Sequence, residues 1–323
     1  MKEKNYVCII LGLVSVILVL VYGLAWLLPE EFYQDPHYYA YWRAQKDYVM
    51  HDDDKEEVLL LGDSCIQSGI LALELSDDAY NLALASSSPV EMYYTLKIYL
   101  VHHPRPKVVF LAFSPEHYRK YDSYLSFAQK YHYFDSSTIN EINQVIKENG
   151  GPDYTKDTFS YRYRLPDVYM KSIFRSIMSP QHQENMKLYE KSKEHKGRLF
   201  FPDKTVGAGN FSEKKSFLFI RADYLNFYME KLIQLCCEEN IPIYLEQMPM
   251  ENSVYQNLME WGYIAKYEYY MKGLRDKYNI FVNCQIPVYP EEYFCDELHL
   301  NEKGAKKFTK EFRDKYHFIF NGK

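Results

Sequence analysis

The most apolar stretch of the sequence lies close to the start of the chain. Residues 6–28, YVCIILGLVSVILVLVYGLAWLL, contain no charged side chain, and about 20 residues at a rise of about 1.5 Å each suffice to cross the hydrocarbon of a bilayer. A cleaved signal peptide has a shorter apolar core and a small-residue cleavage site, whereas this run is long and ends in WLLPEEFY. The pattern favours an uncleaved transmembrane anchor at residues 1–29 over a signal peptide.

The residues on either side of this segment predict its orientation. Lys2 and Lys4 precede it, and the flank that follows begins PEEFYQDP. Because Lys and Arg bias a flank toward the cytoplasm, we expect the short N-terminus inside and residues 30–323 as one extracytoplasmic domain. Three aromatic residues would then lie in the outer interfacial belt of the membrane: Trp26, Phe32 and Tyr33.

Beyond the anchor, short apolar runs alternate with segments of helical character. Runs rich in Val, Ile, Leu and Phe predict buried strands at residues 57–62, 80–84, 107–113, 241–247 and 279–284. Longer segments predict helices at residues 90–102, 222–240, 254–277 and 302–316. Because each strand is apolar throughout, both of its faces must be covered. The sequence therefore predicts a doubly wound α/β domain with a parallel sheet of about five strands.

One interval interrupts this alternation. Residues 119–215 give little strand signal, are rich in Tyr, Phe, Lys and Ser, and include the loop-like GRLFFPDKTVGAGN. A connection of this length inside a compact domain is usually functional or flexible. We interpret it as a partly helical insertion that roofs the functional site and contacts an acceptor. The alternative is a structural or membrane-resting excursion.

Composition excludes one class of partner and leaves the role of an abundant residue open. The formal charge of −6 and the pI near 6.0 give no basic footprint for a nucleic acid. The 33 tyrosines are far above ordinary usage. They either stack on sugar rings with their hydroxyls in water or pack together in an aromatic core.

The cysteines predict neither a disulfide scaffold nor a metal site. The chain has 6 cysteines, scattered and without a CxxC pair, so we expect no zinc or other metal and no cofactor. Cys284 and Cys295 flank a short loop near the end of the chain. A bridge between them is one hypothesis, and two buried thiols are the other.

Two segments far apart in the sequence carry complementary chemistry. The first predicted strand runs into LLLGDSCIQSGI, where Gly62 permits a tight turn and Ser64 opens the next helix at the carboxyl edge of the sheet. A serine hydroxyl is a weak nucleophile until a base takes its proton. The segment CDELHLNEKG supplies His299 as that base, Asp296 to orient its ring and Asn301 to cap the last helix.

These paired motifs, GDS after the first strand and DxxHLN before the last helix, resemble the signature of the SGNH (GDSL) hydrolases. The resemblance spans residues 57–315 apart from the insertion, and it implies a flavodoxin-like α/β fold. It also implies that Ser64 is the nucleophile, His299 the base and Asp296 the carboxylate that orients the base.

The same resemblance implies the oxyanion-binding groups. The family block NxGxxGxT is similar to residues 81–88, and Ser86 stands at the glycine whose backbone N–H joins that of Ser64 in the oxyanion hole. Asp63 and Asn81, which belong to the two blocks, are expected in the same oxyanion and substrate-binding group.

Four residues leave alternatives open. The third family block, GxND, corresponds here to AFSPEHYRKY, which lacks the Asn, so Ser114 or His117 would have to face the crevice in its place. Ser64 itself has an ordinary reading as a capping serine. Cys65 is the rival nucleophile, although its side chain is expected to point away from the crevice in a strand-to-helix turn.

The whole pattern resembles envelope acyl-transfer proteins more than secreted esterases. These relatives are the D-alanyl transfer protein of teichoic acid modification (DltD-like) and the anchored SGNH proteins that O-acetylate exopolysaccharides. They commonly act beside a multi-pass membrane-bound O-acyltransferase, so the resemblance implies an acyl donor, an envelope glycan acceptor and such a partner at the cell membrane.

We therefore expect a membrane-anchored serine O-acyltransferase that modifies a cell-envelope polysaccharide or teichoic acid through an acyl-enzyme on Ser64. Two alternatives stay open. One is an SGNH esterase or lipase that hydrolyses acyl esters, and the other is a catalytically inactive glycan-binding SGNH module.

Overall fold

The computed structural model describes residues 2–29, 31–34, 38–51, 56–118, 124–201 and 219–320. Its centre is a 5-stranded sheet in the order β2-β1-β3-β4-β6, with every neighbouring pair parallel. The strands are β1 (Val58–Gly62), β2 (Ala79–Asn81), β3 (Val108–Ala112), β4 (Ile243–Leu245) and β6 (Phe281–Val282). Each overlaps its predicted run, so the predicted sheet is confirmed. The strand order reverses between β1 and β3, which places the crevice for a ligand outside their carboxyl ends.

Helices cover both faces of the sheet, as predicted. Successive residues of β1 point to opposite sides: Leu59 and Leu61 join one buried core, whereas Val58 and Leu60 join another. The first core is closed by α2 (Tyr39–His51), α5 (Pro89–His102) and α10 (Asp223–Glu238). The second is closed by α3 (Ser64–Gly69), α4 (Ala72–Leu75) and α13 (Glu302–Lys315).

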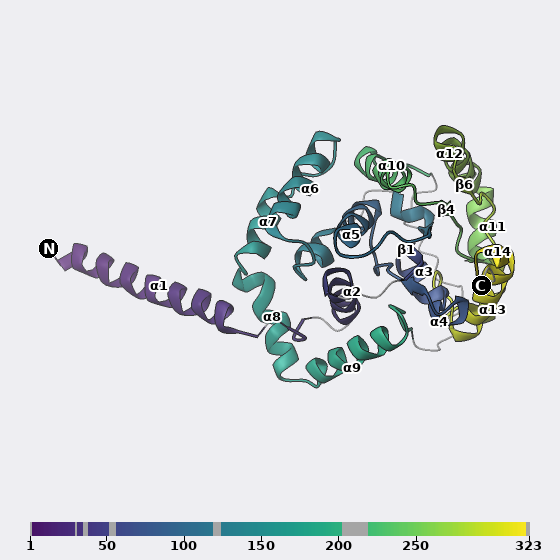
Figure 1. Cartoon of the computed structure of the whole chain (residues 1–323). Helices are drawn as coiled ribbons and strands as arrows, with labels where there is room; N and C mark the ends of the chain where they lie inside the picture. Colours follow the sequence, from purple (N-terminus) through teal and green to yellow (C-terminus); the bar gives the residue numbers. More distant parts are fainter. Residues whose placement is uncertain are drawn as a thin grey trace.

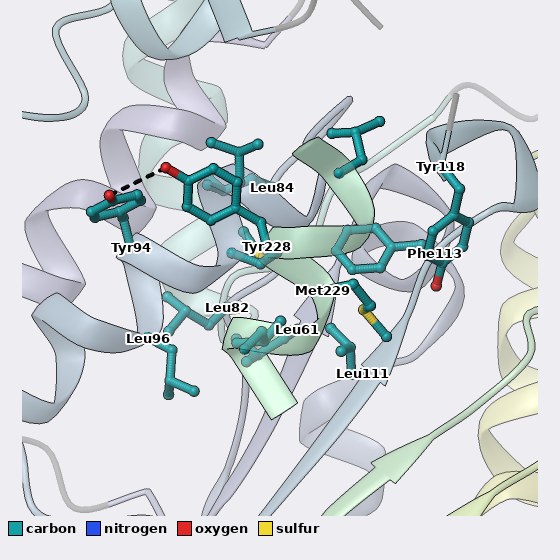
Figure 2. Close-up of a cluster of buried hydrophobic side chains, with 14 of the residues drawn as sticks. Leu61, Leu82, Leu84, Tyr94, Leu96, Leu111, Phe113, Tyr118, Tyr228 and Met229 are labelled. Atoms are coloured by element: carbon teal, nitrogen blue, oxygen red, sulfur yellow. Dashed lines mark hydrogen bonds between the residues drawn. The ribbon is translucent and has the colours of Figure 1, made fainter. Parts of the chain in front are cut away.

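The first core combines aliphatic and aromatic side chains. Figure 2 shows Leu61 and Leu111 from the sheet close to Met229 of α10, with the Tyr94 and Tyr228 hydroxyls paired at its edge. Buried tyrosines occur in many parts of the chain, among them Tyr39, Tyr41, Tyr48, Tyr118, Tyr124, Tyr131, Tyr133, Tyr169, Tyr263, Tyr267 and Tyr270. Aromatic packing therefore accounts for a large part of the tyrosine content.

One predicted helix is wrong in its continuity. The segment predicted as a helix at residues 254–277 forms α11 (Asn252–Glu260) and α12 (Tyr263–Tyr278). Gly262 separates them in a left-handed conformation with φ of 69°, which costs a glycine little because it lacks a side chain. The remaining short elements are β5 (Met250–Glu251), β7 (Val288–Tyr289), η4 (Glu291–Tyr293) and α14 (His317–Phe320).

The N-terminal apolar segment is an exposed helix. Helix α1 (Lys2–Leu27) leaves the rest of the molecule and extends away from it (Figure 1). Within Tyr6–Leu27, the most apolar 18-residue stretch has a mean hydropathy of 3.0 and no buried residue, so the length and composition of the helix suffice to cross a membrane. The helix thus has the properties of a membrane anchor or of a signal sequence.

The described part of the predicted insertion, residues 124–201, is mostly helical. It contains η2 (Tyr124–Gln129), α6 (Ser136–Glu148), α7 (Thr155–Arg162), α8 (Pro166–Ile177) and α9 (Gln181–Glu194), and it is preceded by η1 (Pro115–Tyr118). In Figure 1, α6, α7 and α8 form the side of the molecule from which α1 departs. Residues 119–123 and 202–218, which include most of the predicted loop GRLFFPDKTVGAGN, lie outside the described residues.

All six cysteines lie within the described residues, and no disulfide joins any two of them. The hypothesis of a bridge between Cys284 and Cys295 is therefore wrong. Cys295 is buried, as the other hypothesis expected, whereas Cys284 is only half-buried.

Candidate active site

The turn after β1 fixes Ser64 through backbone geometry. Gly62 has φ of 140°, and a Cβ atom there would come within 1.8 Å of the Ala112 carbonyl oxygen, so the close approach of the ends of β1 and β3 requires glycine. Asp63 is the N-cap of α3 and accepts a hydrogen bond from the Cys65 N–H at 2.9 Å. Ser64 is thus the first residue of the helix rather than its cap, and its reading as a capping serine is wrong.

The carboxylate of Asp63 supports this turn from below. Its second oxygen accepts a hydrogen bond from the Ser114 N–H at 2.6 Å, which joins the carboxyl ends of β1 and β3. Asp63 is fully buried, and both of its oxygens bind backbone amides. The structure therefore gives Asp63 a supporting position under Ser64, not the expected place in the oxyanion and substrate-binding group.

The structure brings Ser64, His299 and Asp296 together. The Ser64 Oγ lies 2.8 Å from His299 Nε2, and the other ring nitrogen, Nδ1, lies 2.8 Å from Asp296 Oδ2. Asp296 also accepts hydrogen bonds from the backbone N–H groups of Leu298 and His299, at 2.8 and 2.7 Å. An ionised Asp296 makes Nδ1 the donor, which leaves Nε2 to accept the Ser64 proton.

The loop that carries His299 is stable because of its own turn and the following helix. The Asn301 side chain caps α13 by accepting from the Gly304 N–H at 3.0 Å, as predicted.

Burial alone would raise the pKa of the Asp296 carboxyl, but the hydrogen bond and charge of His299 and the backbone donors outweigh it. The pKa therefore lies below its ordinary value, and Asp296 stays ionised where a histidine titrates.

Phe201, the last described residue of the insertion, covers the histidine. The rings of Phe201 and His299 are 4.2 Å apart between centroids, and His299 is only 9% exposed. The chain leading to Phe201 lies along α3, because the Leu199 N–H donates to the Gln67 carbonyl at 3.1 Å. The prediction that the insertion reaches over the site is consistent with this contact.

The loop that carries Ser86 is tied to the Ser64 turn. The Gly62 carbonyl accepts from the Leu84 N–H at 3.0 Å and from the Ser87 hydroxyl at 2.8 Å. Ser86 has φ of 60°, a left-handed conformation in which a glycine would be relaxed. This agrees with the glycine that stands at this position in the resembled family.

A buried tryptophan orients the peptide group before Ser86. The indole N–H of Trp42 donates to the Ala85 carbonyl at 3.1 Å. Because a peptide group is planar and trans, the Ser86 N–H points away from that carbonyl and thus away from Trp42. Within the described residues, neither the Ser86 N–H nor the Ser64 N–H donates to another protein group. Both are therefore available to an oxyanion.

Asn81 does not take the expected role in ligand binding. Its side-chain amide donates to the Ile66 and Ile70 carbonyls, at 2.9 and 3.1 Å, and its oxygen accepts from the Ala83 N–H at 3.3 Å. Asn81 is fully buried. It binds the last turn of α3 to β2 and so fixes the helix that begins with Ser64.

The two substitutes for the missing third-block Asn are also buried. Ser114 gives its backbone N–H to Asp63, as described above. His117 contacts the Ser87 carbonyl through Nδ1 at 2.6 Å, and its Nε2 lies 3.7 Å from Asp63. His117 therefore supports the Ser86 loop from behind instead of facing the crevice.

Cys65 faces a cavity of its own. Its sulfur is 3.7 Å from the Leu298 carbonyl oxygen, and its side chain lines a small cavity with Ser114, Met248 and Leu298. Ser64 and His299 do not line that cavity. The prediction that Cys65 points away from the Ser64 crevice agrees with this arrangement.

Sequence reasoning missed Trp42 and Phe201. The only signal for Phe201 was a pair of phenylalanines inside an otherwise polar, loop-like stretch, and Trp42 had no signal beyond its aromatic surroundings. Among the described residues, no three His, Cys, Asp or Glu side chains gather in a way that could hold a metal ion.

Comparison with known proteins leaves the motifs as the basis of the family resemblance. No model of a known protein family matches the chain, and no curated protein sequence matches it significantly. What is established is an α/β fold with a five-stranded parallel sheet, and a hydrogen-bonded Ser64, His299 and Asp296 at the carboxyl edge of that sheet.

Proposed function

We propose that this protein is a membrane-anchored SGNH-type serine O-acyltransferase that modifies a cell-envelope polysaccharide or teichoic acid. The observation that carries the proposal is the chain of hydrogen bonds from Ser64 Oγ to His299 Nε2 and from His299 Nδ1 to Asp296, each 2.8 Å long. Residues 235 positions apart form the first of these bonds. Such an array is what nucleophilic catalysis by serine requires.

The reaction would begin with acylation of Ser64. His299 Nε2 takes the hydroxyl proton as Oγ attacks the carbonyl carbon of an ester or thioester. The N–H groups of Ser64 and Ser86 donate to the resulting oxyanion. Collapse of the tetrahedral intermediate breaks the bond to the leaving group, which takes its proton from the His299 imidazolium.

In the transfer step, the oxygen of an acceptor hydroxyl would be the nucleophile and Ser64 Oγ the leaving group. His299 accepts the proton of an acceptor hydroxyl as that hydroxyl attacks the acyl-enzyme, and Ser64 Oγ departs with the proton returned by the imidazolium. Water would give hydrolysis by the same route, so transfer depends on acceptor binding and on water exclusion. Phe201 on the His299 ring supports the second requirement.

The position of the site favours a glycan over a membrane lipid as the acceptor. Helices α3 and α13, which begin beside Ser64 and His299, lie on the side of the molecule opposite α1 (Figure 1). If α1 is retained as an anchor, the site faces away from the bilayer that holds it. This arrangement supports an extracytoplasmic site directed at the envelope, and it speaks against a lipase acting on the surrounding leaflet.

The source of the acyl group follows from the family resemblance. We propose a multi-pass membrane-bound O-acyltransferase as the partner that supplies an activated acyl group at the membrane. Co-purification of such a protein from the native membrane, in amounts comparable with this chain, is the measurement that tests this partner.

The central test is covalent labelling of Ser64. The full-length protein in nanodiscs is incubated with an activated acyl ester, and the adduct is located by mass spectrometry of peptides. We expect one adduct on Ser64 that is lost in Ser64→Ala and His299→Ala and retained in the matched control Cys65→Ala. An adduct on Cys65 would contradict the proposal.

A second measurement separates transfer from the alternatives. The acyl-enzyme is offered a soluble envelope glycan, a lipid or water alone, and the products are quantified. Faster loss of the adduct with an acylated glycan as product supports transfer. Equal loss with and without glycan would identify an esterase, acylated or cleaved lipid a lipase, and glycan binding without any adduct an inactive glycan-binding module.

A further inference from the structure

Helices α7 and α8 carry an unusual set of exposed apolar side chains. Met178, which follows α8, is 86% exposed, and four large apolar residues nearby are also exposed. We call this set the outer face of α7 and α8, and it consists of Phe159, Tyr163, Phe174, Ile177 and Met178. The residues lie at the spacings of one helix face, with Phe159 and Tyr163 four apart and Phe174 four before Met178.

A neighbouring face of α8 is buried against the C-terminal end of α1. Tyr169 and Ile173 form a small core with Leu28, which directly follows α1. Helix α8 therefore has two apolar faces. One face packs inside the protein, whereas no described residue covers the other.

The C-terminal end of α1 is held beside α7 and α8. The Arg164 guanidinium donates to the Leu28 carbonyl at 3.0 Å, and it lies over the rings of Trp26 and Tyr169 at 5.9 and 5.3 Å. Figure 1 shows α7 and α8 on the side of the molecule where α1 departs, running across its direction. A bilayer crossed by α1 would consequently lie along these two helices.

The charge of the segment also matches a membrane surface. Residues 155–178 contain five basic residues and two acidic ones, whereas the whole chain has a formal charge of −6. Lys171 and Arg175 are exposed on α8, close in sequence to Phe174. Apolar residues flanked by Lys and Arg are typical of helices that lie at the boundary between lipid headgroups and acyl chains.

We propose that the outer face of α7 and α8 rests on the bilayer that α1 crosses, with its apolar side chains in the headgroup region and its basic residues on lipid phosphates. The proposal rests on the proposed retention of α1 as an anchor. It is independent of the chemistry of Ser64, which lies on the far side of the molecule. The bilayer would then hold the domain at two places and fix the direction in which the site faces.

Nitroxide labels on the outer face provide the test. In a background without the exposed cysteines Cys8 and Cys237, the full-length chain carries Phe174→Cys or Met178→Cys. The matched control is Tyr269→Cys, because Tyr269 is also highly exposed, at 81%, but lies on α12. The labelled proteins are placed in nanodiscs that contain an anionic phospholipid, and collision with oxygen and with a water-soluble nickel chelate is measured.

We expect the ratio of oxygen to nickel accessibility to be several-fold higher at positions 174 and 178 than at position 269. Equal ratios at the three positions would overturn the proposal, because the bilayer crossed by α1 would then not cover positions 174 and 178. Dipolar broadening between labels would identify a second copy of the chain as the occupant and would also overturn it. Intact mass shows whether α1 is present, and Ser64 labelling in the same samples reports the site separately.

Discussion

The two ends of the molecule are built in opposite ways. Around Ser64, polar side chains are buried and bind backbone groups, as Asp63, Asn81 and His117 all do. At α7 and α8, apolar side chains are exposed, as Phe174 and Met178 show. Burying a polar group is costly unless its hydrogen bonds are satisfied, and exposing a large apolar patch is costly unless something covers it.

The difference separates positioning of atoms from positioning of the whole domain. Directional hydrogen bonds fix Ser64, His299 and the Ser86 loop relative to one another, which the proposed acyl transfer requires. Apolar contact with a bilayer has no such direction, and it fixes only which side of the domain faces the membrane. Substitutions at the first end should therefore change the chemistry, and substitutions at the second end only the placement.

The largest expected effect is that of Asp296→Asn on acylation. We expect the rate to fall by about 10²–10⁴-fold, because an amide neither stabilises the imidazolium nor enforces the tautomer in which Nε2 is the acceptor. Stopped-flow acylation with an activated ester measures the loss. Asp314→Asn, in the exposed last turn of α13, is the matched control and should leave the rate unchanged.

The same carboxylate predicts a dependence of stability on pH. The pKa of Asp296 is lowered in the folded protein. The carboxylate therefore contributes fully to the free energy of unfolding at pH values above its ordinary pKa, and this contribution is lost as the pH falls through the lowered pKa. In Asp296→Asn this part of the acid-induced loss of stability should be absent. Urea unfolding at several acidic pH values measures it, and parallel curves for the two proteins would contradict the assignment.

The next largest effect concerns the turn that presents Ser64. Gly62→Ala should reduce the free energy of unfolding by about 3–5 kcal/mol, since the Cβ would collide with the Ala112 carbonyl at an unfavourable φ. The control is Gly273→Ala in α12, where nothing lies within 4 Å of the added Cβ. That substitution should stabilise the protein by about 1 kcal/mol, because alanine has the higher helix propensity.

Sequence patterns predicted the sheet because a parallel sheet leaves an unusually clear signal. Each strand is buried on both faces, so Val58 to Leu61 and Val108 to Leu111 read as continuous apolar runs. The break at Gly262 was missed because a single glycine inside a helical pattern is usually tolerated. Helix α2 was missed because its core residues are mostly aromatic and its period is obscured by other tyrosines.

At the site, sequence predicted the residues whose side-chain chemistry is distinctive. Ser64, Asp296 and His299 form a recognisable set wherever they meet. Asp63 and Asn81 were assigned to ligand binding from the motif alone. A motif does not distinguish a side chain that binds a ligand from one that binds the protein backbone. Trp42 and Phe201 act through contacts with residues distant in sequence, the Ala85 carbonyl and the His299 ring, and such contacts leave no local signal.

A smaller effect is expected for the tryptophan behind the proposed oxyanion hole. Trp42→Phe removes the hydrogen bond to the Ala85 carbonyl, so acylation should slow by about 3–10-fold with little change in KM. Binding of a phosphonate that mimics the oxyanion should weaken to the same degree. Trp261→Phe, at the end of α11, is the control. Lower stability without any change in the acylation rate or in phosphonate binding would show that Trp42 contributes to packing and does not orient the Ser86 N–H.

Removal of the ring over the histidine should have a comparable or smaller effect. Phe201→Ala should slow acylation by about 2–10-fold, the range expected for one aromatic pair, and should increase the share of acyl-enzyme lost to water. Phe200→Ala is a close control, because the Phe200 ring contacts Lys191 and Arg198 instead of the site. Equal partition to water in both variants would mean that Phe201 does not exclude solvent.

The smallest expected effect is the coupling between the two ends, and it bears most directly on the comparison. Arg164→Ala removes the contact with Leu28 and Trp26, so nickel accessibility at position 178 should rise. Acylation of a small ester should change by less than about twofold, because Arg164 is distant from Ser64 and shares no partner with it, and such sites are usually not coupled energetically. Arg105→Ala, which lies outside α7 and α8 and loses a contact with the Glu239 carbonyl instead, should affect neither. If Arg164→Ala and Phe201→Ala together slow acylation by much more than the product of their separate effects, the two ends are mechanically linked, and the membrane contact takes part in the chemistry.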